Sequence, residues 1–288
     1  MNSSTLKKAT KYLNNNTIKL LMNNFIKHQS STMSQGHVIT EINDKSGFAT
    51  VTFNRPPANS FNLEFLQDFL KTLDELDRNK CRGMILTSSS PTTFSSGLDL
   101  KEFYNPDEKR LKELIATYVN CCIRLYSTFY PTVAAINGHA IAGGSFMAIN
   151  CEYRVMLPNF RIGMNETQLG MTISEGAIWI MTTLLNPRNA ENALTLGKIF
   201  TTEDAKKIGL IDEIANDKED AIAKSQAFLE SYKKVPIETR GATKQIFRKK
   251  GIDLMTNNRD KDVDVFVKHV LDPKCQKMIE MFLNPKNN

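Results

Sequence analysis

The sequence lacks the cysteine spacing of a zinc site or a disulfide framework. Its five cysteines include no C-x-x-C pair and its four histidines are scattered, so we expect no structural metal and no disulfide scaffold. Such cysteine usage suits a reducing compartment. No apolar run is long enough to span a bilayer, so we expect no membrane partner. The cysteines are Cys81, Cys121, Cys122, Cys151 and Cys275.

Glycine motifs that bind nucleotides are also missing. The glycines between Gly138 and Gly144 do not give G-x-G-x-x-G, and G-x-x-x-x-G-K-[ST] does not occur, which disfavours dinucleotide and P-loop binding. Ser145 follows two glycines but lacks the G-x-S-x-G elbow, which disfavours a serine hydrolase.

Acidic residues are absent from residues 1–40, which hold nearly all of the formal net charge of +6. The rest of the chain is close to balanced, so we expect a mixed-charge surface and no nucleic-acid partner. Residues 1–36 are basic and can form an amphipathic helix, although they contain no arginine. They predict a mitochondrial targeting segment, with a disordered tail as the alternative. The lysines there are Lys7, Lys8, Lys11, Lys19 and Lys27.

Strand and helix patterns alternate after this segment. Residues 38–42 and 48–53 predict a β-hairpin, because β-branched and aromatic residues bracket turn residues. Apolar residues spaced three and four apart predict a helix over residues 62–79. The alternation predicts an α/β core over residues 37–200, and the helical signal that follows predicts a helical region over residues 201–288. Further strands are expected at 83–87, 131–136 and 153–157, and further helices at 107–129 and 142–150.

Two glycine loops follow predicted strands. They are F-S-S-G-L-D-L at residues 94–100 and I-N-G-H-A-I-A-G-G-S at residues 136–145. Glycine lets the backbone turn sharply and approach a ligand closely. The helix after such a loop presents free N–H groups and the positive end of its dipole. Together the loops could donate two N–H groups to one carbonyl oxygen, as an oxyanion hole requires.

Four ordered motifs resemble the crotonase superfamily: N-R-P-P-A-N-S, F-S-S-G-L-D-L, A-I-N-G-H-A-I-A-G-G and N-E-T-Q-L-G. The last is similar to the mitochondrial Δ3,Δ2-enoyl-CoA isomerase branch. The resemblance runs from about residue 37 to the C-terminus. It implies an α/β fold made of a spiral of ββα turns, with a C-terminal helical region used for trimerisation, and therefore a homotrimer. It also implies an acyl-CoA substrate, with coenzyme A as part of the substrate and no separate cofactor.

The resemblance implies the site residues as well. The main-chain amides of Leu98 and Gly143 would hold the thioester carbonyl, and Glu166 would be the catalytic carboxylate. The other expected pocket residues are Ser96, Gly97, Asp99, Leu100, Phe146 and Asn165, the last of them beside Glu166.

Phe146 separates an isomerase from a hydratase. Hydratases of this superfamily use two glutamates around a water, and here the corresponding positions hold Phe146 and Glu166. Phenylalanine cannot transfer a proton, so a hydratase would be impaired, whereas one carboxylate suffices to move a proton from C2 to C4 of a 3-enoyl thioester. We expect an apolar surround, made by Ile141, Phe146, Met164 and Leu169, to raise the pKa of Glu166 toward neutrality.

We therefore predict a Δ3,Δ2-enoyl-CoA isomerase that serves β-oxidation of unsaturated fatty acids in the mitochondrial matrix. The absence of a C-terminal S-K-L address agrees with this location. One alternative is a hydratase with an unidentified second acid. Glu175 is a competing carboxylate, although its position favours a role at the start of a helix. The other alternative is a non-catalytic protein of this fold that binds acyl-CoA or RNA.

Overall fold

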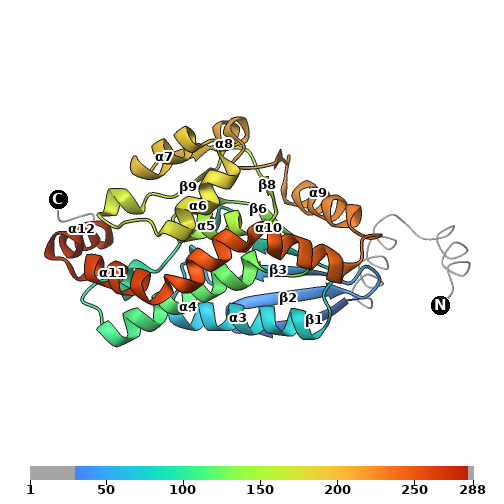
Figure 1. The fold of residues 1–288 in the computed structure, drawn as a ribbon, viewed down its shortest axis with the longest axis horizontal. Coiled ribbons are helices and arrows are strands. Elements are labelled where there is room, and N and C mark those ends of the chain that lie inside the picture. The colour runs from blue at the N-terminus through green and yellow to red at the C-terminus, as the bar shows by residue number, and fades with distance from the viewer. Residues whose placement is uncertain (1–29, 285–288) are drawn as a thin grey trace, which may run out of the picture.

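The computed structural model describes residues 30–284, which form two β-sheets and the helices packed around them (Figure 1). In the larger sheet, β1 to β3 are antiparallel to one another and every later neighbour pair is parallel. Its seven strands lie in the spatial order β1 (Ser30–Gln35), β2 (Val38–Asn43), β3 (Phe48–Phe53), β4 (Gly83–Ser88), β6 (Thr132–Ile136), β8 (Tyr153–Met156) and β11 (Glu213–Ile214).

The smaller sheet has four strands, and three of them follow directly on strands of the larger sheet. Its order is β10 (Ile199–Thr201), β9 (Arg161–Gly163), β7 (His139–Ile141) and β5 (Thr93–Ser95). The chain passes from β4 to β5, from β6 to β7 and from β8 to β9, and helical structure follows each pair. This repetition confirms the predicted ββα spiral.

Several helices begin at a residue whose polar side chain caps them. The side chain of Asn62 accepts a hydrogen bond from Phe65 N at the start of α3, and Asp107 does the same for Arg110 N at the start of α4. The helices are α3 (Leu63–Arg78), α4 (Glu108–Tyr126), α5 (Gly143–Asn150), α6 (Glu175–Leu184), α7 (Pro187–Thr195), α8 (Thr202–Ile208), α9 (Lys218–Ser231), α10 (Ile237–Asn257), α11 (Arg259–Leu271) and α12 (Pro273–Leu283), with short 3-10 turns η1 (Leu100–Glu102) and η2 (Glu166–Leu169).

The helix expected over residues 107–129 ends earlier, at Tyr126. Ser127 Oγ donates to Ile123 O, and Thr128 Oγ1 donates to Leu125 O and Tyr130 O. Thr128 Oγ1 thus satisfies Leu125 O, a carbonyl that a further helical turn would have bonded, and Pro131 then leads into β6.

Two predicted boundaries are wrong. Residues 30–35, which the sequence pattern assigned to the N-terminal segment, form edge strand β1, paired along its length with β2. The sequence of β1, S-S-T-M-S-Q, has no apolar alternation that would predict a strand. An edge strand can join a sheet through backbone hydrogen bonds. The targeting prediction for residues 1–29 lies outside the described residues.

The boundary at residue 200 also changes. β11 pairs with β8, and α9 packs against β4, β6 and β8, so residues up to the end of α9 belong to the α/β core. Only α10, α11 and α12 form a separate helical layer, which packs on α4 and α6. α11 and α12 lie at the end of the molecule opposite to α9 and β1 (Figure 1).

Candidate active site

The smaller sheet brings the two glycine loops together. Strands β5 and β7, which precede the loops, are parallel neighbours, with Ser95 opposite Ala140. A Cβ on Gly97 would lie 2.8 Å from Gly143 N and 3.0 Å from Ile141 O. Gly97 also has a φ of +86°, so only glycine fits there without strain. The two loops predicted from sequence are therefore in direct contact.

The pairing of Phe61 fixes the direction of the Leu98 amide. Phe61 N donates to Gly97 O at 2.8 Å, and Asp99 N donates to Phe61 O at 3.1 Å. Successive backbone groups alternate in direction along an extended segment, so the N–H of Leu98 points away from Phe61. Among the described residues, that N–H has no hydrogen-bond acceptor.

The second amide belongs to the first residue of α5. An N–H in the first turn of a helix has no partner within the helix, and Gly143 N finds none elsewhere in residues 30–284. The preceding residue, Ala142, has a φ of +50° and a ψ of −128°. A non-glycine residue in this region is strained, and such strain is concentrated at functional sites.

A cavity of about 400 Å³ opens beside these two amides. It is bounded by the two loops, by η2 and by side chains of α4, α6 and α11. Seven of the predicted site residues line it: Ser96, Leu98, Leu100, Gly143, Phe146, Asn165 and Glu166.

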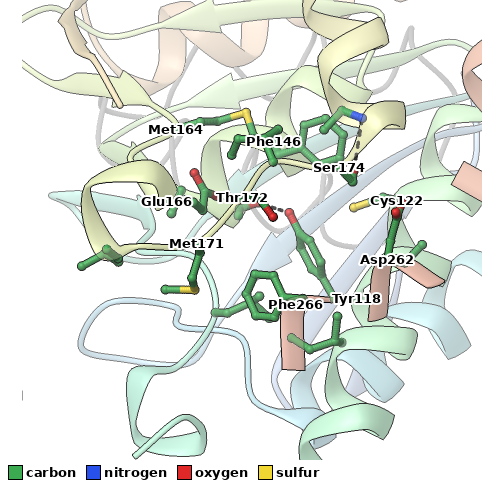
Figure 2. A pocket seen from close by; sticks show the side chains of 18 of the residues that line it. Tyr118, Cys122, Phe146, Met164, Glu166, Met171, Thr172, Ser174, Asp262 and Phe266 are labelled. Carbon is green, nitrogen blue, oxygen red and sulfur yellow. Dashed lines mark hydrogen bonds between the residues drawn. The ribbon is translucent and has the colours of Figure 1, made fainter. Parts of the chain in front are cut away.

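Glu166 is the first residue of η2, and its carboxylate has few polar neighbours. Its Oε2 is buried without a hydrogen-bond partner among the described residues, and so is Oδ1 of the neighbouring Asn165. Burial raises the pKa of Glu166 from 4.5 to about 7. Figure 2 shows Glu166 with Phe146 and Met164 on one side of the pocket, and the hydroxyl of Tyr118 directed toward them.

The predicted apolar surround of this carboxylate is present. Ile141, Phe146, Met164 and Leu169 all line the same cavity as Glu166. Phe146 is only 6% exposed, and its ring, which cannot transfer a proton, fills this part of the cavity wall. The cavity thus holds a carboxylate with a near-neutral pKa together with two free N–H donors.

Two predicted pocket residues do not line the cavity. Gly97 supports it from behind, because it packs against Gly143 N. Asp99 turns away: its Oδ2 lies 2.9 Å from Arg55 Nη1 and accepts a hydrogen bond from Ser60 Oγ. Its Oδ1 caps η1 by accepting from Lys101 N. Asp99 is therefore an anchor of the first loop.

Glu175 reaches the cavity wall at the start of α6, where Ser174 is the N-cap. Its side chain is exposed, and its Oε2 accepts a hydrogen bond from Asn258 Nδ2 at 3.2 Å. Glu175 thus combines the expected place in the first turn of a helix with a place at the rim of the pocket.

The sequence pattern did not identify the pocket residues that come from α4 and α11. Tyr118 and Cys122 belong to a helical face with ordinary apolar spacing, and Asp262 and Phe266 lie far along the chain (Figure 2). Only the packing of α11 on α4 brings these pairs to one cavity.

The described residues contain no group of three or more His, Cys, Asp or Glu side chains that could hold a metal ion. Within residues 30–284, none of the helices is both long and apolar enough to cross a bilayer.

Comparison with known proteins identifies the family. Residues 43–287 match the enoyl-CoA hydratase/isomerase family. The mitochondrial enoyl-CoA delta isomerase 1 of Rattus norvegicus is 35% identical over 256 residues, which cover 87% of each chain. Its Homo sapiens counterpart is 34% identical over 252 residues, which cover 85% of this chain and 82% of the relative.

Solved structures of this family are also similar to the chain. The crystal structure of human mitochondrial delta3-delta2-enoyl-CoA isomerase superposes with a TM-score of 0.83 at 32% identity and covers 87% of this chain and 98% of that one. An enoyl-CoA hydratase from Bacillus halodurans, at 22% identity and a TM-score of 0.75, shares the fold over 88% of this chain and 99% of its own. The chain therefore belongs to the crotonase superfamily, as an enzyme of the enoyl-CoA hydratase/isomerase family.

Proposed function

We propose that this enzyme converts 3-enoyl-CoA into 2-trans-enoyl-CoA with Glu166 as its only proton carrier. The observation that carries the proposal is a single near-neutral carboxylate, beside Phe146, in an apolar cavity next to two free amides. The relatives named enoyl-CoA delta isomerase support the reaction class.

In the proposed mechanism, Glu166 removes a proton from C2 of the bound thioester. The electron pair of the C2–H bond moves toward the thioester carbonyl, and the N–H groups of Leu98 and Gly143 stabilise the charge on its oxygen. Protonated Glu166 then gives the same proton to C4 while the double bond forms between C2 and C3. The reaction begins and ends with the same atoms and the same overall oxidation state, so we propose that it needs no metal or redox cofactor beyond the coenzyme A of the substrate.

The raised pKa of Glu166 suits both halves of this cycle. A carboxylate with a pKa near 4.5 is a weak base, whereas one with a pKa near 7 accepts a proton more readily and is still ionised in a large fraction of molecules at neutral pH. Free N–H donors set at the carbonyl add stabilisation that grows as charge develops on the oxygen.

Hydration is the second candidate, and Glu175 is the observation that favours it. A hydratase needs a second acid near the bound water, and Glu175 lines the cavity that holds Glu166. Its exposure and its hydrogen bond with Asn258 support the isomerase instead, because an exposed carboxylate is poorly placed to protonate a buried carbon.

The experiment compares isomerisation of 3-hexenoyl-CoA with hydration of crotonyl-CoA, in the wild type, Glu166→Gln and Glu175→Gln. We expect rapid isomerisation, slow hydration, and a loss of about 1,000-fold or more in kcat for Glu166→Gln, with acyl-CoA affinity retained. Glu230→Gln, on α9 and outside the cavity, is the matched control. Fast hydration that collapses in Glu175→Gln would establish the hydratase. Acyl-CoA binding with neither reaction would identify a non-catalytic binding protein.

We further propose that the enzyme acts in β-oxidation of unsaturated fatty acids in the mitochondrial matrix, as a homotrimer. The word mitochondrial in the names of the relatives supports the location. Ile246 and Phe247 on α10 are 77% and 86% exposed, and such an apolar pair on a helix supports self-association. A sedimentation measurement on the wild type and on Phe247→Glu tests it: a trimer that dissociates in the variant is expected, and a monomeric wild type would contradict it.

A further inference from the structure

We propose that Tyr118 is a positioning residue that holds the Gly143 amide in the orientation the oxyanion requires. The inference rests on the proposed function, since it assigns a role toward the same site. Tyr118 lies in α4, at the centre of the cavity wall (Figure 2).

Tyr118 fixes Gly143 by a hydrogen bond and by contact. Its Oη donates to Gly143 O at 3.0 Å. A Cβ on Gly143 would lie 3.0 Å from this oxygen, which is tighter than ordinary packing, so the hydroxyl sits directly against the glycine. Glycine has the least restricted backbone of all residues, and it follows the strained Ala142. The N–H of Gly143 shares its peptide plane with Ala142 O, which accepts a hydrogen bond from Phe146 N at 3.0 Å. Tyr118 holds the other side of the same glycine, at its Cα and its carbonyl.

The ring of Tyr118 also reaches the first loop. It stacks on Phe61, with 6.2 Å between ring centroids and an angle of 29° between planes. The main chain of Phe61 holds the residues on both sides of Leu98. One side chain thus contacts the supports of both proposed oxyanion donors, which sets the two amides relative to each other.

The hydroxyl of Tyr118 stays a donor over the range in which Glu166 titrates. Burial, then the nearby thiol of Cys122 and the carboxylate of Glu166, raise the pKa of Tyr118 well above 10. A change in the charge of Glu166 therefore leaves the hydrogen bond to Gly143 O in place.

Tyr118→Phe removes this hydrogen bond and keeps the ring. Removing an oxyanion donor costs a factor of about 100 to 1,000 in kcat, so loosening one should cost about 10-fold. We expect KM for 3-hexenoyl-CoA to change by less than about 2-fold, because the interaction strengthens only as charge develops. The vibrational frequency of an isotope-labelled thioester carbonyl in bound 2-hexenoyl-CoA reports the polarisation directly, and we expect its shift toward lower frequency to shrink in the variant.

Tyr153→Phe is the matched control, because it removes a hydroxyl that donates to Glu213 Oε1 at 2.7 Å, away from the cavity. It should change neither kcat nor the carbonyl frequency. An unfolding curve for each variant establishes that both are folded.

The outcomes separate this inference from the proposed function. If the wild type isomerises 3-hexenoyl-CoA while Tyr118→Phe keeps its kcat and its carbonyl frequency, Tyr118 has no positioning role. If the wild type does not isomerise this substrate, the proposed function fails, and the carbonyl frequency alone decides the role of Tyr118. A lower kcat with an unchanged carbonyl frequency would also overturn the inference, since the loss would then arise elsewhere.

Discussion

Two glutamates, Glu152 and Glu166, occupy similar positions in the chain but opposite electrostatic settings. Each follows the end of a regular element by two or three residues, Glu152 after α5 and Glu166 after β9, and each is largely withdrawn from solvent. Glu152 forms ion pairs with Arg240 and with Lys244, whose Nζ lies 2.8 Å from Glu152 Oε1. Oε2 of Glu166 has no partner among the described residues.

The difference shows how this fold separates stability from chemistry. The carboxylate of Glu152 compensates two cationic side chains of α10 that burial would otherwise disfavour, and burial lowers the pKa of Lys244 well below 10.5. Glu166 receives no such compensation, so its pKa rises to about 7. A paired buried carboxylate fastens α10 to the core, whereas an unpaired one is ready to accept a proton.

The largest expected effect comes from breaking the paired site. Glu152→Gln leaves Arg240 and Lys244 buried without their counter-charge, which should lower the free energy of unfolding by about 3–5 kcal/mol. Glu166→Gln removes an uncompensated carboxylate and should not destabilise the fold. Urea unfolding at neutral pH measures both.

Asp253→Asn is the control for Glu152→Gln, because it breaks an exposed pair with Lys249 on the same helix and should cost less than about 1 kcal/mol. Equal losses for Glu152→Gln and Asp253→Asn would mean that the buried pair does not fasten α10. A marked loss for Glu166→Gln would remove the contrast between the two glutamates.

The next effect is the pH dependence of stability at the unpaired site. The folded pKa of Glu166 is about 7 and its ordinary value is 4.5, so the unfolded chain releases this proton first as the pH rises. Its contribution to stability is complete below about pH 4.5 and is lost as the pH rises through about 7. The free energy of unfolding of Glu166→Gln, relative to that of the wild type, should therefore increase by on the order of 2–3 kcal/mol between about pH 5 and pH 8.5. A constant difference across that range would show that Glu166 titrates normally.

Local sequence patterns predicted much of the fold and of the site around Glu166. The hairpin of β2 and β3, the helix predicted over residues 62–79 and the two glycine loops are short-range features, and the structure confirms them. The place of Glu166 followed from a motif, and its apolar surround followed from nearby residues such as Met164 and Leu169.

Long-range partners were not predictable in the same way. Asp99 looked like a pocket residue because it follows Gly97, but its direction is set by Arg55, which lies more than forty positions earlier. Tyr118 looked like one more apolar position of a helix, and its hydrogen bond to Gly143 O exists only because α4 packs on α5. β11 is too short for any periodicity and is defined by its partner β8.

The smallest expected effect is on the pH profile of isomerisation, and it tests whether the apolar surround raises the pKa of Glu166. In the proposed mechanism Glu166 must be ionised to remove a proton, so kcat/KM for isomerisation should rise with pH to a plateau, with a midpoint at about 7. Met164 is 5% exposed and lies beside Glu166 in the pocket (Figure 2). In Met164→Gln, an amide of similar size can donate a hydrogen bond to the carboxylate, which should lower the midpoint by about one pH unit, or about 1.4 kcal/mol.

Met281→Gln, at an exposed site on α12, is the control and should leave the midpoint unchanged. An unchanged or higher midpoint in Met164→Gln would mean that the apolar surround is not what holds the pKa up, and that Glu166 differs from Glu152 for another reason.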